Sequence, residues 1–166
     1  STHSDLHDFI RIVKGVKRPR NGFFLRAESL YNVASNIDKL DKDFCGPKII
    51  DSYGGRSLHE QSHGESFLAI FMNKFLGNGL YILDEPEAAL SPTRQMTLIS
   101  RMHELVENGS QFIIATHSPI IMAYPNSIIY EVKEELKVVK YEETEHYQVT
   151  KAFLNNTQKM IDILLD

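Results

Sequence analysis

The sequence has no tryptophan and a single cysteine, Cys45, among its 166 residues. One cysteine excludes an internal disulfide framework and a zinc site built from several cysteines, and it is typical of a reducing compartment. No apolar run approaches the roughly 20 residues of a membrane-spanning helix, and the first ten residues lack the charged and apolar regions of a signal peptide. The sequence therefore predicts a cytoplasmic protein without a membrane span.

The charges are unevenly placed along the chain, and the net charge is -4. Between Asp8 and Glu28 every charged residue is basic, namely Arg11, Lys14, Lys17, Arg18, Arg20 and Arg26. Such a stretch could face the phosphates of a nucleic acid, although a solvated helix end and loop would have the same composition. Acidic residues dominate from Glu131 to Glu145, which indicates an exposed surface hairpin.

Hydrophobic periodicity and turn residues predict one α/β domain over residues 1–166. Helices are expected over 3–14, 28–40, 63–76, 92–107, 146–156 and 157–166, and strands over 22–27, 80–84, 111–116, 127–132 and 136–141, with a loop over 45–57. The runs "LYILD" and "QFIIAT" show no alternation, which is typical of strands buried on both faces of a parallel sheet. Their β-α-β order predicts such a sheet with a right-handed crossover. In the helix between them Met96, Ile99, Met102 and Val106 are expected to face inward.

Three polar residues are expected to meet at one edge of this sheet. Asp84 and Glu85 follow one buried strand, and His117 follows the next. Ligands of open α/β sheets gather beyond the carboxyl ends of the strands. An aspartate near a divalent cation, a glutamate near the attacking water and a histidine near the γ-phosphate would suit phosphoryl transfer to water. Each residue alone has ordinary structural explanations.

A further candidate lies at the start of the helix over 63–76, in "QSHGES". The free N–H groups of a helix N-terminus attract anions, so Ser62 and Gly64 could contact a phosphate. The alternative is a plain capping box, with Ser62 as the cap and Glu65 completing it. The two interpretations are compatible.

The ordered segments "LHEQSHGES", "LYILDEPEAALSP" and "FIIATHSP" resemble the second half of an ABC-type ATPase domain, closest to soluble AAA-family ATPases of bacteria. The resemblance spans about Leu58 to Pro119. It implies a P-loop NTPase-like fold of the ABC type, ATP and Mg²⁺ as cofactors, and a homodimer formed through the signature motif and the D-loop. It divides the chain into a helical, Q-loop-like region over 1–57 and the motif-bearing region over 58–166.

The resemblance also implies a role for each matching residue. Ser62, Gly64 and Glu65 would be the signature that reaches a nucleotide on the opposite subunit, and Ser91 of the D-loop would lie near the dimer interface. Asp84 would be the Walker B aspartate on Mg²⁺, with Glu28 as a further candidate ligand in a Q-loop-like position. Glu85 would be the catalytic glutamate and His117 the switch histidine.

Two positions depart from the pattern of the family. His63 stands where transporter-type proteins carry glycine, and Pro92 follows Ser91 in the D-loop, which lacks the usual aspartate. Both departures are consistent with a soluble branch of the family.

The larger departure is the lack of a phosphate-binding loop. No two glycines are five positions apart, and neither Gly-Lys-Ser nor Gly-Lys-Thr occurs. Such a loop wraps the phosphates with its backbone N–H groups. In the resembled family it precedes the signature, so the chain is expected to be the C-terminal part of a longer ATPase and to be inactive alone.

Two alternatives remain beside this interpretation. A non-catalytic interaction or nucleic-acid-associated module could use the basic stretch and a two-fold interface, although such a module has no need of Glu85 and His117. Histidine pairs also suggest zinc, namely His3 with His7, His59 with His63, and His117 with His146. No third ligand stands at suitable spacing, so zinc is not expected.

Overall fold

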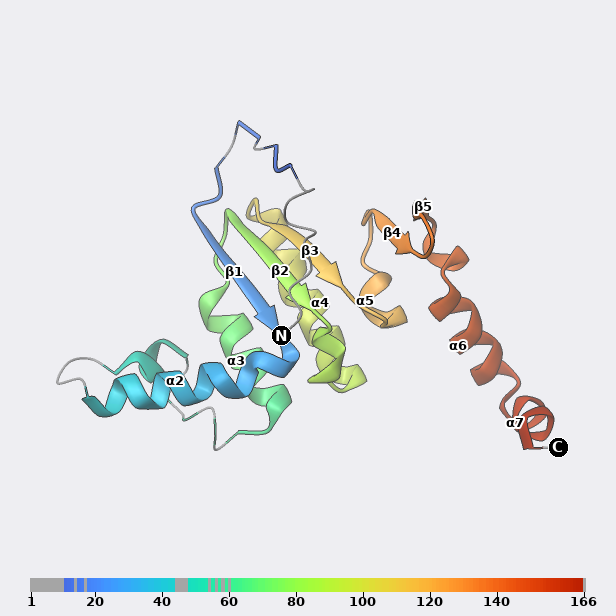
Figure 1. Cartoon of the computed structure of the whole chain (residues 1–166), viewed down its shortest axis with the longest axis horizontal. Coiled ribbons are helices and arrows are strands. Elements are labelled where there is room, and N and C mark those ends of the chain that lie inside the picture. Colours follow the sequence, from blue (N-terminus) through green and yellow to red (C-terminus); the bar gives the residue numbers. More distant parts are fainter. Residues whose placement is uncertain are drawn as a thin grey trace.

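The computed structural model describes residues 11–13, 15–16, 18–43, 48–53, 55, 57, 59 and 61–165. Most of the helix expected over 3–14, together with His3, His7, Cys45 and Leu58, lies outside the described residues. In the described part, the elements follow one another as a small α/β unit and then a hairpin with two terminal helices (Figure 1).

The centre of the fold is a parallel sheet of three strands. Strands β1 (Asn21–Arg26), β2 (Gly79–Asp84) and β3 (Gln111–Ala115) lie side by side in that order. Helix α2 (Leu30–Asp43) and helix α3 (His63–Lys74) stand between β1 and β2 in the chain, and α4 (Pro92–Glu107) connects β2 to β3. The predicted parallel sheet is therefore confirmed.

One face of the sheet packs against helices α3 and α4 and forms the core. Aromatic rings fill its centre, and Phe75 lies among them with ring centroids 4.2 Å from Tyr81, 4.6 Å from Phe71 and 5.4 Å from Phe23. Both Phe71 and Phe75 are completely buried. Phe67 and Phe71 of α3, with Phe75 at its C-terminal end, thus form the face that is buried in the core.

Tyr81 joins three elements at the end of the sheet opposite the strands' carboxyl termini. Its hydroxyl oxygen lies 2.5 Å from both Asn21 Oδ1 and the carbonyl oxygen of Leu76, and it accepts the N–H of Leu76 at 2.6 Å. Burial raises the pKa of this hydroxyl, while the backbone bond of Leu76 acts in the opposite direction. Tyr81 thereby ties the end of α3 to the first strand.

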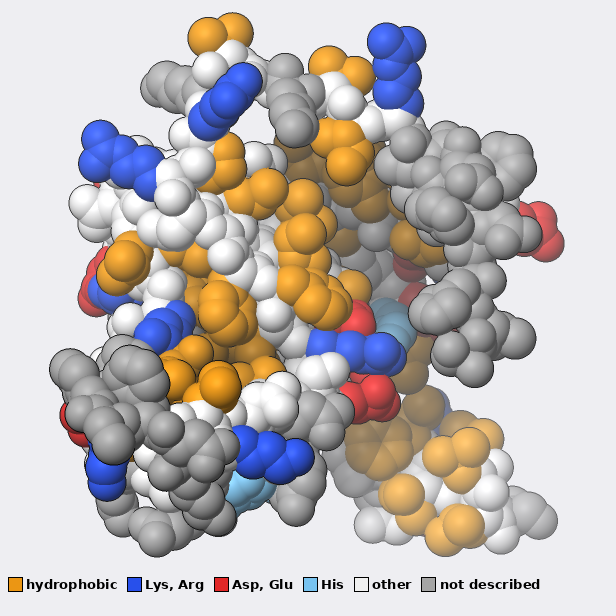
Figure 2. All heavy atoms as spheres, turned by 60° about the vertical axis from the view of Figure 1, so that its left-hand side comes forward, with side chains coloured by type: hydrophobic (Ala, Val, Ile, Leu, Met, Phe, Trp, Pro, Cys, Tyr) orange, Lys and Arg blue, Asp and Glu red, His pale blue; other side chains and the backbone are white. Residues whose placement is uncertain are grey.

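The opposite face of the sheet is open in the described part of the chain. Phe24, Ile82 and Ile113 lie opposite one another across the three strands, and they are 60%, 39% and 52% exposed. A hollow of about 450 Å³ lies on this face beside Leu80 and Ile82. Figure 2 shows hydrophobic side chains gathered on one side of the molecule, above a place where basic, acidic and histidine side chains meet.

The prediction that "LYILD" and "QFIIAT" are buried on both faces is therefore wrong for the described structure. Strand β2 alternates between buried and partly open positions, and in β3 the alternate residues are exposed. The physical reason is that helices α3 and α4 cover a single face. Apolar residues on the second face of the sheet indicate that burial of this face is favourable. They do not indicate which segment would cover it, and no described helix does so.

The buried stripe of α4 also differs from the prediction. Gln95, Leu98, Met102 and Leu105 are buried, whereas Met96 is 56% exposed. Of the residues expected to face inward, Met102 alone is buried. The prediction used apolar residues only, whereas the buried face of α4 includes the polar residue Gln95. Elsewhere, Leu40 on α2 is 57% exposed, and the expected loop over 45–57 contains a 3-10 helix, Ile49–Tyr53.

The C-terminal part follows the prediction closely. After a short helix α5 (Pro119–Met122), strands β4 (Ile129–Val132) and β5 (Leu136–Val139) form an antiparallel hairpin. Helices α6 (Glu145–Asn155) and α7 (Thr157–Leu165) then extend away from the parallel sheet (Figure 1). None of the helices in the described part of the chain is long and apolar enough to cross a membrane.

Candidate functional site

The ends of β2 and β3 bring Glu85 and His117 together. Asp84 is the register partner of Ala115, and the N–H of Glu85 donates to the carbonyl of Ala115 at 2.9 Å. The two residues after Ala115 then place His117 Nε2 3.6 Å from Glu85 Oε1. Both side chains are open to solvent, so a ligand could reach the space between them.

Glu85 has a left-handed backbone conformation. Its φ is 47° and its ψ is 53°, which is uncommon for a residue other than glycine, asparagine or aspartate. The chain turns here from β2 into the 3-10 helix Pro86–Ala88, and this turn directs the glutamate side chain toward β3. A residue other than glycine held in this region costs about 1–2 kcal/mol, and such conformations concentrate at functional sites.

Asp84 is paired with Arg26, which the sequence indicated only as a member of the basic stretch. Arg26, its register partner on β1, lies with Nε 3.1 Å from Asp84 Oδ2 and with Nη2 3.3 Å from Glu28 Oε2. One guanidinium therefore brings Asp84 and Glu28 close together. The neighbouring register position on a parallel strand is the signal that could have identified Arg26 from the sequence.

The site can be compared with what Mg²⁺ requires. Proteins hold Mg²⁺ through one or two carboxylates together with waters and substrate phosphates. Asp84 is partly exposed and fits the role of a single carboxylate ligand, although Arg26 would compete with the cation for Oδ2. Within the described part of the chain, no group of three or more His, Cys, Asp or Glu side chains could hold a metal ion by itself.

Glu87 holds the turn that carries His117. Its Oε2 accepts the hydroxyl of Thr116 at 2.7 Å, and its Oε1 accepts the backbone N–H of His117. The third carboxylate of "DEPE" thus acts on the backbone after β3. Its position two residues beyond Glu85 gave no indication of this contact, since the partners are about 30 residues away in sequence.

Gln95 connects the same turn to the loop before α4. It is buried, its Nε2 donates to the carbonyl of Leu90 at 3.0 Å, and its Oε1 accepts the hydroxyl of Ser118 at 2.5 Å. These bonds satisfy a polar side chain inside the core stripe of α4. They also fix the loop before α4 relative to the turn around His117. A glutamine at the helical spacing of Leu98 and Met102 is the signal that points to this residue.

The start of α3 forms a capping box, as one of the two compatible interpretations predicts. The N–H of Glu65 donates to Ser62 Oγ at 3.4 Å, and the N–H of Ser62 donates to Glu65 Oε2 at 2.9 Å. The hydroxyl of Ser62 also lies 2.9 Å from Glu65 Oε2. The capping box leaves the partial positive charge of the helix N-terminus in place.

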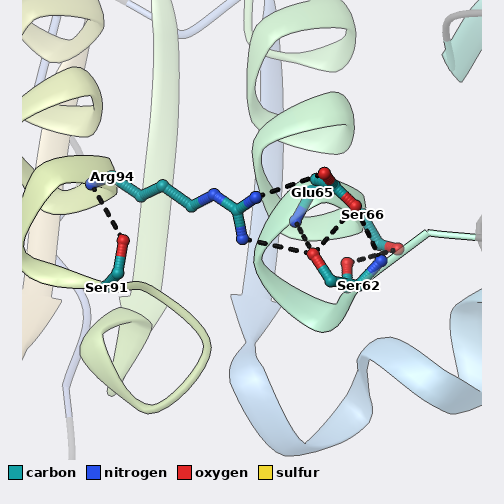
Figure 3. Close-up of polar contacts among 5 residues, drawn as sticks. All are labelled: Ser62, Glu65, Ser66, Ser91 and Arg94. Atoms are coloured by element: carbon teal, nitrogen blue, oxygen red, sulfur yellow. Dashed lines mark hydrogen bonds and ion pairs between the residues drawn. The ribbon is translucent and has the colours of Figure 1, made fainter.

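Arg94 of α4 reaches this capping box. Its Nη1 donates to Ser62 Oγ at 3.2 Å, and its Nη2 lies 3.3 Å from Glu65 Oε1 (Figure 3). The backbone N–H of Arg94 in turn bonds Ser91 Oγ, the N-cap of α4, at 3.4 Å. The predicted signature residues and Ser91 are therefore brought together through Arg94, which sequence reasoning missed.

Gly64 lets α3 approach the loop before α4 closely. A Cβ atom at this position would lie 2.7 Å from the carbonyl oxygen of Ala89 and 2.5 Å from Arg94 Nη1. The arginine end can move, but the Ala89 carbonyl belongs to the backbone. Glycine is therefore required here for the space that it leaves.

Gly64→Ala is expected to lower the free energy of unfolding by about 1–3 kcal/mol, because the new methyl group forces α3 away from Ala89. For a chain of this size that corresponds to a loss of roughly 2–12 °C in Tm, measurable by circular dichroism. Gly15→Ala is the matched control, since a Cβ at Gly15 has no atom within 4 Å. An equal Tm for the two variants would contradict the close approach.

Other sequence predictions are placed as follows. His59 Nε2 lies 3.2 Å from Ser35 Oγ, and His117 Nδ1 lies 3.0 Å from His146 Nε2. Of the basic stretch, Arg11, Arg18 and Arg20 are exposed, whereas Arg26 is engaged by Asp84 and Glu28. Lys14 and Lys17 lie outside the described residues.

A parallel α/β sheet with polar residues at its carboxyl edge is compatible with a P-loop NTPase-like fold. Residues 50–123 match the family model described as "AAA domain, putative AbiEii toxin, Type IV TA system". The match covers α3, β2, α4 and β3, and with them Ser62, Asp84, Glu85 and His117. It supports an AAA-type P-loop NTPase domain with a nucleotide-binding, ATPase-like function. Searches of curated proteins and of solved structures found no significant match.

Proposed function

We propose that the chain carries the hydrolytic residues of an ABC-type ATPase that binds ATP and Mg²⁺ and acts as a homodimer in the cytoplasm. The observation that carries the proposal is the meeting of Glu85 and His117 at adjoining strand ends, with Glu85 Oε1 3.6 Å from His117 Nε2. The left-handed backbone of Glu85 supports it, because the fold accepts a costly conformation at that residue.

Each residue has a chemical role in the proposal. The Glu85 carboxylate orients the attacking water and accepts its proton as the water oxygen bonds to the γ-phosphorus, while the bond from the γ-phosphorus to the β–γ bridging oxygen breaks and ADP leaves. His117 donates its Nε2–H toward the oxygen atoms that gain negative charge. Asp84 would hold the Mg²⁺, which would neutralise negative charge on the phosphates when bound, and Glu28 is a second candidate for that role. Glu87 and Gln95 keep the turn of His117 in place.

The start of α3 would serve the nucleotide of a second copy. Its N-terminal N–H groups, Gly64 and the hydroxyl of Ser62 would face the γ-phosphate across the dimer interface, with Ser91 nearby. Glu65 and Arg94 hold Ser62 in place through their contacts with its hydroxyl. The proposal therefore makes hydrolysis depend on dimerisation.

The 166-residue chain alone is expected not to bind Mg²⁺-ATP at micromolar concentration, because its sequence has no phosphate-binding loop. Isothermal titration calorimetry with Mg²⁺-ATP measures this directly. A protein that contains a G-x-x-x-x-G-K-[ST] loop together with these residues is expected to bind and hydrolyse ATP. Micromolar, Mg²⁺-dependent binding by the 166-residue chain would contradict the first expectation, and failure of the loop-containing protein to hydrolyse ATP would contradict the proposed function.

A further inference from the structure

A second histidine contacts the ring of His117 on the side away from Glu85. His146 Nε2 lies 3.0 Å from His117 Nδ1, and the two ring centroids are 4.9 Å apart. His146 lies in the first turn of α6, 29 residues beyond His117. The proposed function uses His117 and assigns no part to His146.

The first turn of α6 is fixed by several independent contacts. Thr144, its N-cap, is buried and accepts the N–H of Tyr147 at 3.4 Å. Lys133 of the hairpin lies 3.2 Å from Glu131 and 3.4 Å from Glu145, and these carboxylates raise the pKa of the Lys133 amine. The ring of Tyr147 also packs on Tyr141, with centroids 4.6 Å apart. His146 is therefore presented by an anchored helix start.

The surroundings of His117 favour one neutral tautomer. Glu85 Oε1, which only accepts hydrogen bonds, lies 3.6 Å from Nε2, so a hydrogen on Nε2 faces a carboxylate and is favoured electrostatically. In that tautomer Nδ1 is an acceptor, and His146 Nε2 donates to it at 3.0 Å. The hydrogen bond then runs from His146 to His117, and the Nε2–H of His117 lies on the side of Glu85.

We propose that His146 is a positioning residue for His117. Its Nε2–H donates to His117 Nδ1 and holds the His117 ring in one orientation. The Nε2–H of His117 is thereby kept on the side of Glu85, where the proposed function places the attacking water and the γ-phosphate. The catalytic consequence rests on the proposed function: a His117 ring that turns freely would present its N–H to the γ-phosphate for a smaller fraction of the time.

The contact itself is tested on the 166-residue chain with ¹⁵N-labelled histidine. Long-range ¹H–¹⁵N spectra are recorded well above the ordinary histidine pKa of about 6.5, where the rings are neutral. In the unmodified chain His117 is expected as the Nε2–H tautomer, with its Nδ1 resonance displaced by the hydrogen bond. His146→Leu is expected to move that resonance to the value of an unbonded nitrogen, and His146→Gln, which keeps an N–H donor, is expected to restore part of the displacement.

His103→Leu is the matched control, because His103 is also an exposed helical histidine but bonds Tyr124 at 3.2 Å. It is expected to leave the His117 resonances unchanged. His146 is exposed, so neither of its substitutions requires repacking of the core. An unchanged His117 Nδ1 resonance in His146→Leu overturns the proposal, whatever the effect on hydrolysis.

The positioning role is tested in the loop-containing protein, that is, a protein that has a G-x-x-x-x-G-K-[ST] phosphate-binding loop together with the residues of this chain. His146→Leu is expected to lower kcat about 3- to 10-fold with KM for ATP nearly unchanged, the size of effect that loss of one hydrogen bond produces. His146→Gln is expected to recover most of kcat. If Glu85→Gln is inactive but His146→Leu keeps full kcat, the positioning role is overturned and the proposed function stands. If Glu85→Gln keeps full activity, the proposed function fails, and the Nδ1 resonance still decides the contact.

Discussion

Glu85→Gln is expected to lower kcat for ATP hydrolysis by about 10²- to 10⁴-fold in the loop-containing protein while leaving the Kd for Mg²⁺-ATP nearly unchanged. Glutamine keeps the size and the hydrogen-bonding capacity of the side chain but cannot accept the proton of the attacking water. It adopts the left-handed backbone of this position no more easily than glutamate does, so the fold is expected to keep its stability. Steady-state hydrolysis and calorimetric binding measure the two quantities separately.

Glu107→Gln is the matched control for this substitution. Glu107 is an exposed glutamate at the end of α4, and it has no place in the proposed chemistry. Its kcat is expected to stay within about twofold of the unmodified protein, as surface substitutions away from a site are close to neutral. Hydrolysis that survives in Glu85→Gln would remove Glu85 from the proposed role, and a joint loss of nucleotide binding would indicate a structural effect.

Phe75→Ala is expected to lower the free energy of unfolding by about 3–5 kcal/mol, the largest stability effect that we predict. The ring is fully buried and packs on Phe23, Phe71 and Tyr81, so its removal leaves a cavity between the sheet and α3. For a domain of this size the loss corresponds to roughly 6–20 °C in Tm. Urea unfolding followed by circular dichroism gives the free energy, and thermal unfolding gives the shift in Tm.

Phe24→Ala removes the same side chain from the other face of the sheet. Phe24 is 60% exposed, so its loss is expected to cost less than about 1 kcal/mol. Equal losses at Phe24 and Phe75 would contradict the one-sided core, because they would mean that the open face is covered in solution. A loss below 1 kcal/mol at Phe75 would contradict the packing of the ring cluster.

The sequence was sufficient to predict the elements that position the site. Two apolar runs with a helix between them require a parallel sheet, and parallel strands end at a common edge. Those two rules predict that Glu85 and His117 lie near each other, and the structure confirms it. The terminal hairpin and both terminal helices were also predicted correctly, because their turn residues and periodicity are strong and local.

Contacts between distant residues could not be predicted in the same way. His117 and His146 were paired in the sequence only as candidate zinc ligands. Their direct contact arises because the hairpin and Thr144 set the start of α6, which the local pattern of neither histidine encodes. Gln95 is buried on the core-facing side of α4, where hydrophobic periodicity predicts apolar residues only. The predicted buried face of α4 was therefore wrong. The sequence did not predict that helices cover only one face of the sheet. The composition of a strand indicates that its side chains favour burial, but it does not identify the element that buries them.

At Glu85, selection for stability and selection for hydrolysis would favour different residues. Glycine would adopt φ 47° and ψ 53° without the steric cost that a Cβ atom brings, so selection for stability alone would favour glycine at this position. Selection for hydrolysis would keep the carboxylate. If Glu85 has the proposed role, each folded molecule retains a small, permanent loss of stability in return for a proton acceptor at the end of β2, and directed evolution for thermal tolerance without an activity screen would tend to remove it.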